Sequence, residues 1–178
     1  MNPNIVGYHT NTEKRVRSFL EKNELVLSDD THYLGLGMYF WDNLSNAKYW
    51  ANKKKEESGS KTVYICKANI FIQEPILDLT DKETVKVVRD LWYSFCDKTD
   101  EKERYQPIGV ILNTLFKVFP DKIGKFEISK AHGDYSTRYK MKFLQRLGNY
   151  SYIDDRPKTI YAVRAISRIK NQSQHITV

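Results

Sequence analysis

Residues 33–41, Tyr-Leu-Gly-Leu-Gly-Met-Tyr-Phe-Trp, place two glycines ahead of three aromatic side chains. Glycine lets a backbone turn sharply or approach a ligand closely, and an aromatic ring can cover a flat heterocycle. Trp50 adds a further ring eleven positions after Tyr39. On residue types alone, these glycines and aromatics form either a ligand site or part of the hydrophobic core. Phe40 is assigned to the core.

Histidine is the other candidate for chemistry, and the chain has four. His9 lies near the end of the first expected strand, although an isolated histidine is more often structural than catalytic. No Ser-His-Asp order, HExxH motif or glycosidase-like pair of carboxylates occurs. Cys66 and Cys96 lack the spacing of a metal site, so we expect no metal and two reduced thiols.

Hydrophobic periodicity predicts the elements that position these residues. Strands are expected at residues 4–9, 37–41, 62–72 and, as the last strand, 159–166. Helices are expected at 12–22, from 42–45 to 51, after a Thr80-x-x-Glu83 capping box, at 107–119 and at 137–147. Segment 52–61 is expected to be a surface loop, 132–136 a turn and 171–178 a fraying tail.

The helix after the capping box is predicted to bury Val85, Val88, Trp92 and Phe95. Strands and helices are intermixed without a regular βαβ rhythm, which indicates the α+β class. No GxGxxG motif follows a strand and no GxxxxGK[ST] motif occurs, so neither a Rossmann nor a P-loop site is supported. The length of 178 residues predicts one domain, 1–178.

The net charge of +7 is concentrated near the C-terminus. Residues 136–170 hold nine basic and two acidic side chains, so the rest of the chain is neutral. Arg138, Lys142 and Arg146 form one stripe of the helix expected there, and tyrosines are interleaved with the basic residues. Such a region attracts phosphate-rich partners, and its aromatics can stack unpaired bases. A solvated basic helix face is the alternative interpretation.

No apolar run is long enough to span a bilayer and no secretory signal is evident, so we expect a cytoplasmic protein without a membrane partner.

Residues 4–51 resemble the NAD-binding core of ADP-ribosyltransferases of the diphtheria-toxin and poly(ADP-ribose) polymerase type. The family has a strand ending in His, a helix, a GxGxYF strand and a helix with a second aromatic. His9, the segment 35–40 and Trp50 occupy those places. The resemblance extends to residue 79 and, weakly, to a last core strand at 158–170. It implies a split mixed β-sheet core with flanking helices.

The resemblance also implies roles for individual residues. Tyr39 and Trp50 would hold the cationic nicotinamide ring of NAD by stacking and cation–π attraction. His9 would bind an adenosine-side ribose hydroxyl, and the backbone of Thr10 would hold the carboxamide. Gly35 and Gly37 would clear space for the dinucleotide.

The chain departs from the family at several places. Thr10 replaces a glycine, and Ala47 replaces a serine that contacts the carboxamide. The family's third motif position, usually Glu, is Ile160 here, or Thr159 if the strand shifts by one residue. Without that carboxylate we expect a single transfer and no polymer. Asp154 and Asp155, with Glu127 as a further candidate, are the acids that would replace it.

The combined interpretation is a mono-ADP-ribosyltransferase that modifies RNA or single-stranded DNA with ADP-ribose from NAD. Stand-alone domains of this kind are often bacterial toxins or phage-defence effectors, so an antitoxin partner is also expected. Three alternatives stay open: transfer to a protein side chain, an inactive domain that binds nucleic acid or ADP-ribose-like ligands, and an RNA 2′-phosphotransferase. The last would need basic catalytic residues near the first strand that are not evident.

Overall fold

The computed structural model describes residues 4–29, 31, 33–59, 62–99, 104–134 and 157–178. The described helices are α1 (Glu13–Lys22), α2 (Leu44–Ser58), α3 (Lys82–Thr99), α4 (Ile108–Val118), α5 (Pro120–Ile123) and the 3₁₀ turn Ile166–Arg168. The strands are β1 (Asn4–Asn11), β2 (Ser28–Asp29), β3 (Leu36–Trp41), β4 (Tyr64–Phe71), β5 (Leu77–Asp78), β6 (Ile128–Asp134), β7 (Pro157–Val163) and β8 (Ile169–Thr177). The class is therefore α+β, as predicted.

One mixed sheet runs in the order β5-β6-β7-β3-β1-β4-β8, with β2 paired to β3 outside this path. The β5–β6 pair is parallel, and the other pairs are antiparallel. β1 pairs with β4 over eight residues, but its pairing with β3 is the single position Tyr8↔Trp41. The sheet therefore has two halves, β5-β6-β7-β3 and β1-β4-β8, which are joined at the pair Tyr8↔Trp41 and diverge beyond it.

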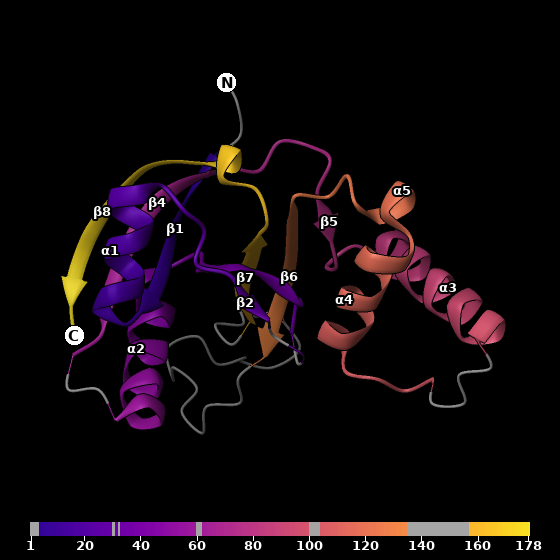
Figure 1. The fold of residues 1–178 in the computed structure, drawn as a ribbon, viewed down its shortest axis with the longest axis horizontal. Coiled ribbons are helices and arrows are strands. Elements are labelled where there is room, and N and C mark those ends of the chain that lie inside the picture. The colour runs from indigo at the N-terminus through magenta and orange to yellow at the C-terminus, as the bar shows by residue number, and fades with distance from the viewer. Residues whose placement is uncertain (1–3, 30, 32, 60–61, 100–103, 135–156) are drawn as a thin grey trace, which may run out of the picture.

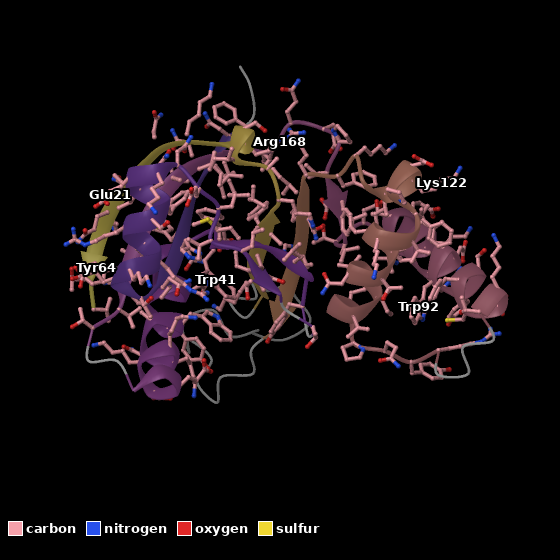
Figure 2. All side chains as sticks on the ribbon, viewed as in Figure 1. Glu21, Trp41, Tyr64, Trp92, Lys122 and Arg168 are labelled. Carbon is pink, nitrogen blue, oxygen red and sulfur yellow. The ribbon has the colours of Figure 1, made fainter. Side chains whose placement is uncertain are left out.

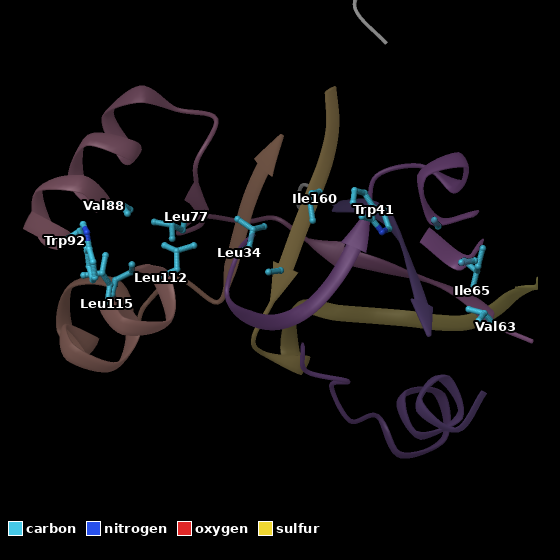
Figure 3. Packing of buried hydrophobic residues seen from close by; sticks show 14 of the residues in the cluster. Leu34, Trp41, Val63, Ile65, Leu77, Val88, Trp92, Leu112, Leu115 and Ile160 are labelled. Atoms are coloured by element: carbon cyan, nitrogen blue, oxygen red, sulfur yellow. The ribbon is translucent and has the colours of Figure 1, made fainter. Parts of the chain in front are cut away.

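Helices pack against the sheet (Figure 1), whose central strands bury apolar residues on both faces. Phe40 and Trp41 are neighbours on β3 and point to opposite faces, as the two-residue period of a strand requires. Phe40 is fully buried beside α1, with Val16 and Phe19. Trp41 belongs to the other cluster, which extends from α2 across the sheet to α3 and α4 (Figure 3). The core assignment of Phe40 is confirmed.

Helix α2 is longer than predicted, since residues 52–58 continue the helix and do not form a loop. Polar helices are stabilised by pairs three or four residues apart, and Lys53 lies 3.3 Å from Glu56. Gly59 ends the helix in the left-handed conformation, with φ of 63°. The loop was predicted from the many charged residues of this segment. In the structure these residues belong to the solvent-facing side of the helix.

The capping box predicted for α3 was also wrong. The carboxylate of Asp81 accepts hydrogen bonds from the backbone N and the hydroxyl of Thr84, both at 2.8 Å, so Asp81 begins the helix. Thr80 instead donates to Asp78. With this start, Val88, Trp92 and Cys96 face the core, and Val85 is 45% exposed.

Two strands near the C-terminus differ from the expectations. Segment 132–136 was expected to turn, but residues up to 134 continue β6, which pairs with β7 from Ile128↔Val163 to Asp134↔Pro157. The tail is strand β8, which pairs with β4, so 159–166 is not the last strand. β8 is an edge strand, and all of its side chains except that of Ile169 are exposed or only partly buried, which agrees with its polar sequence. The helix expected at 137–147 lies outside the described residues.

Candidate active site

An open pocket of about 180 Å³ lies where β1 and β3 diverge. Its walls come from the C-terminal end of β1, from α1, β2, β3 and α2, and from β7. The lining side chains are His9, Thr10, Asn11, Arg15, Val26, Ser28, Tyr33, Tyr39, Trp41, Trp50, Lys54, Glu57 and Ile160. Five residues singled out in the sequence therefore share one pocket, namely His9, Thr10, Tyr39, Trp50 and Ile160.

His9 bridges the gap between the two halves of the sheet. Its Nδ1 donates to the carbonyl oxygen of Tyr39 at 2.8 Å, which takes the place of a backbone ladder bond between β1 and β3. Because Nδ1 carries the proton, Nε2 is an acceptor, and Asn11 Nδ2 donates to it at 3.3 Å. Burial is the main cause that lowers the pKa of His9 to about 4; the hydrogen bond to Tyr39 opposes it, and the nearby cations Lys54 and Arg15 add to it. His9 is therefore neutral at pH 7.

Tyr39 is held by its hydroxyl group as well as by its strand. The hydroxyl donates to the carbonyl oxygen of Gly35 at 2.6 Å and accepts from the backbone N of Leu34 at 3.0 Å. Residues 34 and 35 are thus tied to the ring that lines the pocket. This arrangement fixes the position of the ring before any ligand arrives.

The two glycines of the opening motif pack against protein and do not line the pocket. Gly35 has φ of 71°, and a Cβ there would overlap Asn113 Oδ1, which accepts from the backbone N of Leu36 at 2.6 Å. A Cβ on Gly37 would lie 3.0 Å from the Cβ of Ala162 on β7. Both glycines allow close packing around β3, and the space they clear is filled by these neighbours.

The aromatic wall contains a residue that the sequence left unassigned. Trp41 and Trp50 stack with ring centroids 5.6 Å apart and an interplanar angle of 13°. One face of Trp50 is therefore covered by Trp41, and both residues line the pocket. Thr10 helps to seat α2 beside it, since its hydroxyl donates to the carbonyl oxygen of Ala47 at 3.0 Å.

Strand β7 brings Ile160 to the pocket. Ile160 pairs with Trp41 of the neighbouring strand β3, is buried, and lines the pocket. Thr159, the alternative for the third motif position, is outside the lining and lies 3.4 Å from His132 Nδ1. This part of the wall is accordingly apolar.

Sequence reasoning missed Asn11, Arg15, Trp41, Lys54 and Glu57. Lys54 and Glu57 follow Trp50 by four and seven residues, which is the spacing of one helix face. Periodicity would have identified them if α2 had been extended beyond residue 51. Glu57 is the carboxylate among the described lining residues, whereas Glu127 lies outside the lining and binds Arg168 at 2.6 Å.

The described part of the basic C-terminal region uses two of its arginines internally. Arg164 donates to Ser129 Oγ at 2.8 Å and to the carbonyl oxygen of Leu34 at 2.9 Å, and its guanidinium lies 4.0 Å from the ring centre of Phe116. Burial lowers its pKa to about 10, so it stays charged at pH 7. Arg168, the last residue of the 3₁₀ turn (Figure 2), pairs with Glu127.

Several predicted residues lie outside the described ranges. They are the basic stripe Arg138, Lys142 and Arg146 and the two candidate acids Asp154 and Asp155. Within the described ranges, no three His, Cys, Asp or Glu side chains come together as a metal site would require. In the same ranges, no helix has both the length and the apolar character needed to cross a bilayer.

Comparisons with known proteins give one distant relative. An uncharacterized protein of Methanocaldococcus jannaschii, MJ0359, is 31% identical over 121 residues, an alignment that covers 62% of this chain and 55% of that protein. The chain thus spans about half the length of the curated relative it matches. No family model matches the chain, and no solved structure matches it.

Proposed function

We propose that the chain is a mono-ADP-ribosyltransferase with an ADP-ribosyltransferase-like fold, a NAD-dependent enzyme of the glycosyltransferase class. The acceptor we propose is nucleic acid, either RNA or single-stranded DNA. The proposal includes a role as a toxin or defence effector that a partner antitoxin would restrain.

One observation carries this proposal. His9, Tyr39, Trp50 and Ile160 come from four different elements, yet they line the same pocket. His9, Tyr39 and Trp50 are positions at which the sequence resembles the NAD-binding core of the family, and Ile160 stands at the family's third motif position. The narrow junction between β1 and β3 also agrees with the split sheet that the resemblance implies.

The composition of the pocket suits the proposed chemistry. The nicotinamide ring of NAD is cationic until the glycosidic bond breaks, so aromatic faces stabilise it by stacking and cation–π attraction. Tyr39 and the Trp41–Trp50 pair supply such faces. The neutral imidazole of His9 adds no charge that would repel the ring.

The reaction proposed here is a single transfer. The bond between ribose C1′ and the nicotinamide nitrogen breaks, and nicotinamide leaves as a neutral molecule with the bonding electrons. The acceptor then forms a bond to C1′ of the oxocarbenium-like ribose and releases its proton to solvent. Positioning and electrostatic complementarity to that cation provide the rate enhancement. The apolar Ile160 offers no carboxylate to activate a ribose hydroxyl, which argues against chain elongation.

The choice of acceptor rests on the charge distribution of the sequence. The whole net charge of +7 resides in residues 136–170. Arg164 and Arg168 are engaged inside the fold, so the remaining basic residues of that region would contact the phosphates. Their contribution is sequence-independent and sensitive to salt.

The test is to incubate the protein with radiolabelled NAD and RNA, single-stranded DNA or a protein extract, and then digest with nuclease or protease. We expect label that nuclease removes, together with free nicotinamide. Trp50→Ala should abolish labelling, whereas Tyr105→Ala, at an aromatic that is 91% exposed and outside the pocket, should not.

Label that only protease removes would reject nucleic acid as the acceptor. Failure to release nicotinamide in every arm would reject the enzymatic function.

A further inference from the structure

Two cationic side chains line the pocket, one from α1 and one from α2. Arg15 lies in the first turn of α1, and Lys54 lies on α2, one turn beyond Trp50. Both act electrostatically on His9, which places their charges on the same region of the pocket. Glu57 is the lining acid in the described residues, so the described charges of the lining sum to a positive value when His9 is neutral.

On α2 an aromatic ring, Trp50, is followed by a cation, Lys54, and in NAD the nicotinamide ring is followed by an anionic diphosphate. Successive turns of a helix are about 5.4 Å apart, so Lys54 lies about one turn further along α2 than Trp50. A ribose separates the nicotinamide ring of NAD from its first phosphate. A ring held against the Trp41–Trp50 stack therefore directs the diphosphate toward Lys54, and Arg15 of α1 lines the same pocket.

The two side chains are suited to this task in different ways. The planar guanidinium of arginine presents paired donors that match phosphate oxygens, and the ammonium group of lysine acts as a mobile point charge. A phosphate in the pocket would accept from both side chains. The aromatic wall, in contrast, has no group that could neutralise an anion.

We propose that Arg15 and Lys54 form a phosphate-binding subsite that recognises the diphosphate of a dinucleotide. The inference rests on the proposed function, because it assumes that the aromatic wall holds the ring of the same ligand. It goes further by giving the ligand a direction in the pocket, with its ring at the stacked tryptophans and its diphosphate at Arg15 and Lys54.

The experiment compares three probes by isothermal titration calorimetry at constant ionic strength. NAD has both the ring and the diphosphate, nicotinamide riboside has the ring without phosphate, and inorganic pyrophosphate has the anion without the ring. The variants are Arg15→Gln and Lys54→Gln. The matched controls are Lys14→Gln and Lys55→Gln, which remove the same charge one position away at residues outside the pocket lining.

We expect each pocket variant to weaken NAD and pyrophosphate binding roughly tenfold, the loss of one charge-assisted hydrogen bond. Binding of nicotinamide riboside should change less than about twofold, and the controls should resemble the wild type. Equal losses for nicotinamide riboside would overturn the subsite, because the residues would then support the whole pocket.

The remaining outcomes separate this inference from the proposed function. If the wild type binds NAD and the pocket variants bind it equally well, the subsite is wrong and the proposed function stands. If pyrophosphate binds through Arg15 and Lys54 but NAD does not bind, the subsite stands and the proposed function fails. Binding of no probe would overturn both.

Discussion

Lowering the pH from about 7.5 to about 4.5 should reduce the free energy of unfolding by about 2.5 kcal/mol through His9 alone. His9 is 5% exposed, and burial lowers its pKa to about 4, compared with 6.5 for an unperturbed histidine. The unfolded chain therefore binds a proton at a pH where the folded protein does not. The loss begins as the pH falls below about 6.5 and is complete below about 4, at 1.36 kcal/mol for each pKa unit.

The assay is urea denaturation at several pH values for the wild type and for His9→Asn. The Asn Nδ2 atom can replace the Nδ1 donor toward the Tyr39 carbonyl, and the amide does not titrate. Carboxyl groups such as Asp81, whose pKa is lowered by the hydrogen bonds from Thr84, affect both proteins equally. The difference between the two curves therefore isolates His9.

We expect the stability of the wild type to approach that of His9→Asn as the pH falls, by about 2.5 kcal/mol over this range. Parallel curves would show that His9 titrates alike in both states. The buried, neutral histidine at the junction of β1 and β3 would then be refuted, and the arrangement of the pocket with it.

Three further predictions concern the elements around the pocket. Gly35→Ala should cost about 3 kcal/mol in urea denaturation, because it adds a clash with Asn113 to an unfavourable φ, whereas Gly59→Ala, with open space around it, should cost about 1 kcal/mol. Tyr39→Phe should destabilise the fold by about 2 kcal/mol, measured in the same way, because it leaves the backbone groups of residues 34 and 35 without their partner; an unchanged stability would contradict the hydroxyl contacts. Cys66 should not react with a disulfide reagent at pH 8 until the protein unfolds, because burial raises the pKa of its thiol to about 12, and rapid labelling of the native protein would contradict this burial.

The parts of the fold with strong apolar patterns could be predicted from the sequence. β1, β3, β4 and the helices α1 and α4 have large apolar residues at the period of their element, because they face a core on one or both sides. β6 and β8 lack that pattern. Ser129 and Lys130 of β6 are polar because they bind Arg164 and Asp78, and β8 is polar because most of its side chains are exposed or only partly buried. Their strand conformation is set by pairing with distant residues.

In the candidate site too, features set by local sequence could be predicted, and features that depend on distant residues could not. Residues at fixed positions within a local motif, such as Tyr39 and Trp50, could be selected from the sequence. Arg15 and Lys54 could not, since their relation depends on how α1 and α2 are placed on the sheet. Gly35 and Gly37 were given a ligand-clearing role, but their neighbours Asn113 and Ala162 come from α4 and β7, far along the chain. Local sequence cannot reveal which distant side chain fills the space above a glycine.

The central claim is that the pocket between β1 and β3 binds NAD, and the three tryptophans of the chain allow a direct test. Trp41 and Trp50 line the pocket, whereas the indole of Trp92 donates to the carbonyl oxygen of Arg104 in the α3 region. The measurement is an NMR titration with NAD that follows the three indole N–H resonances. We predict that the resonances of Trp41 and Trp50 shift together and saturate, while that of Trp92 stays in place. Saturating NAD that leaves Trp41 and Trp50 unchanged would contradict the claim.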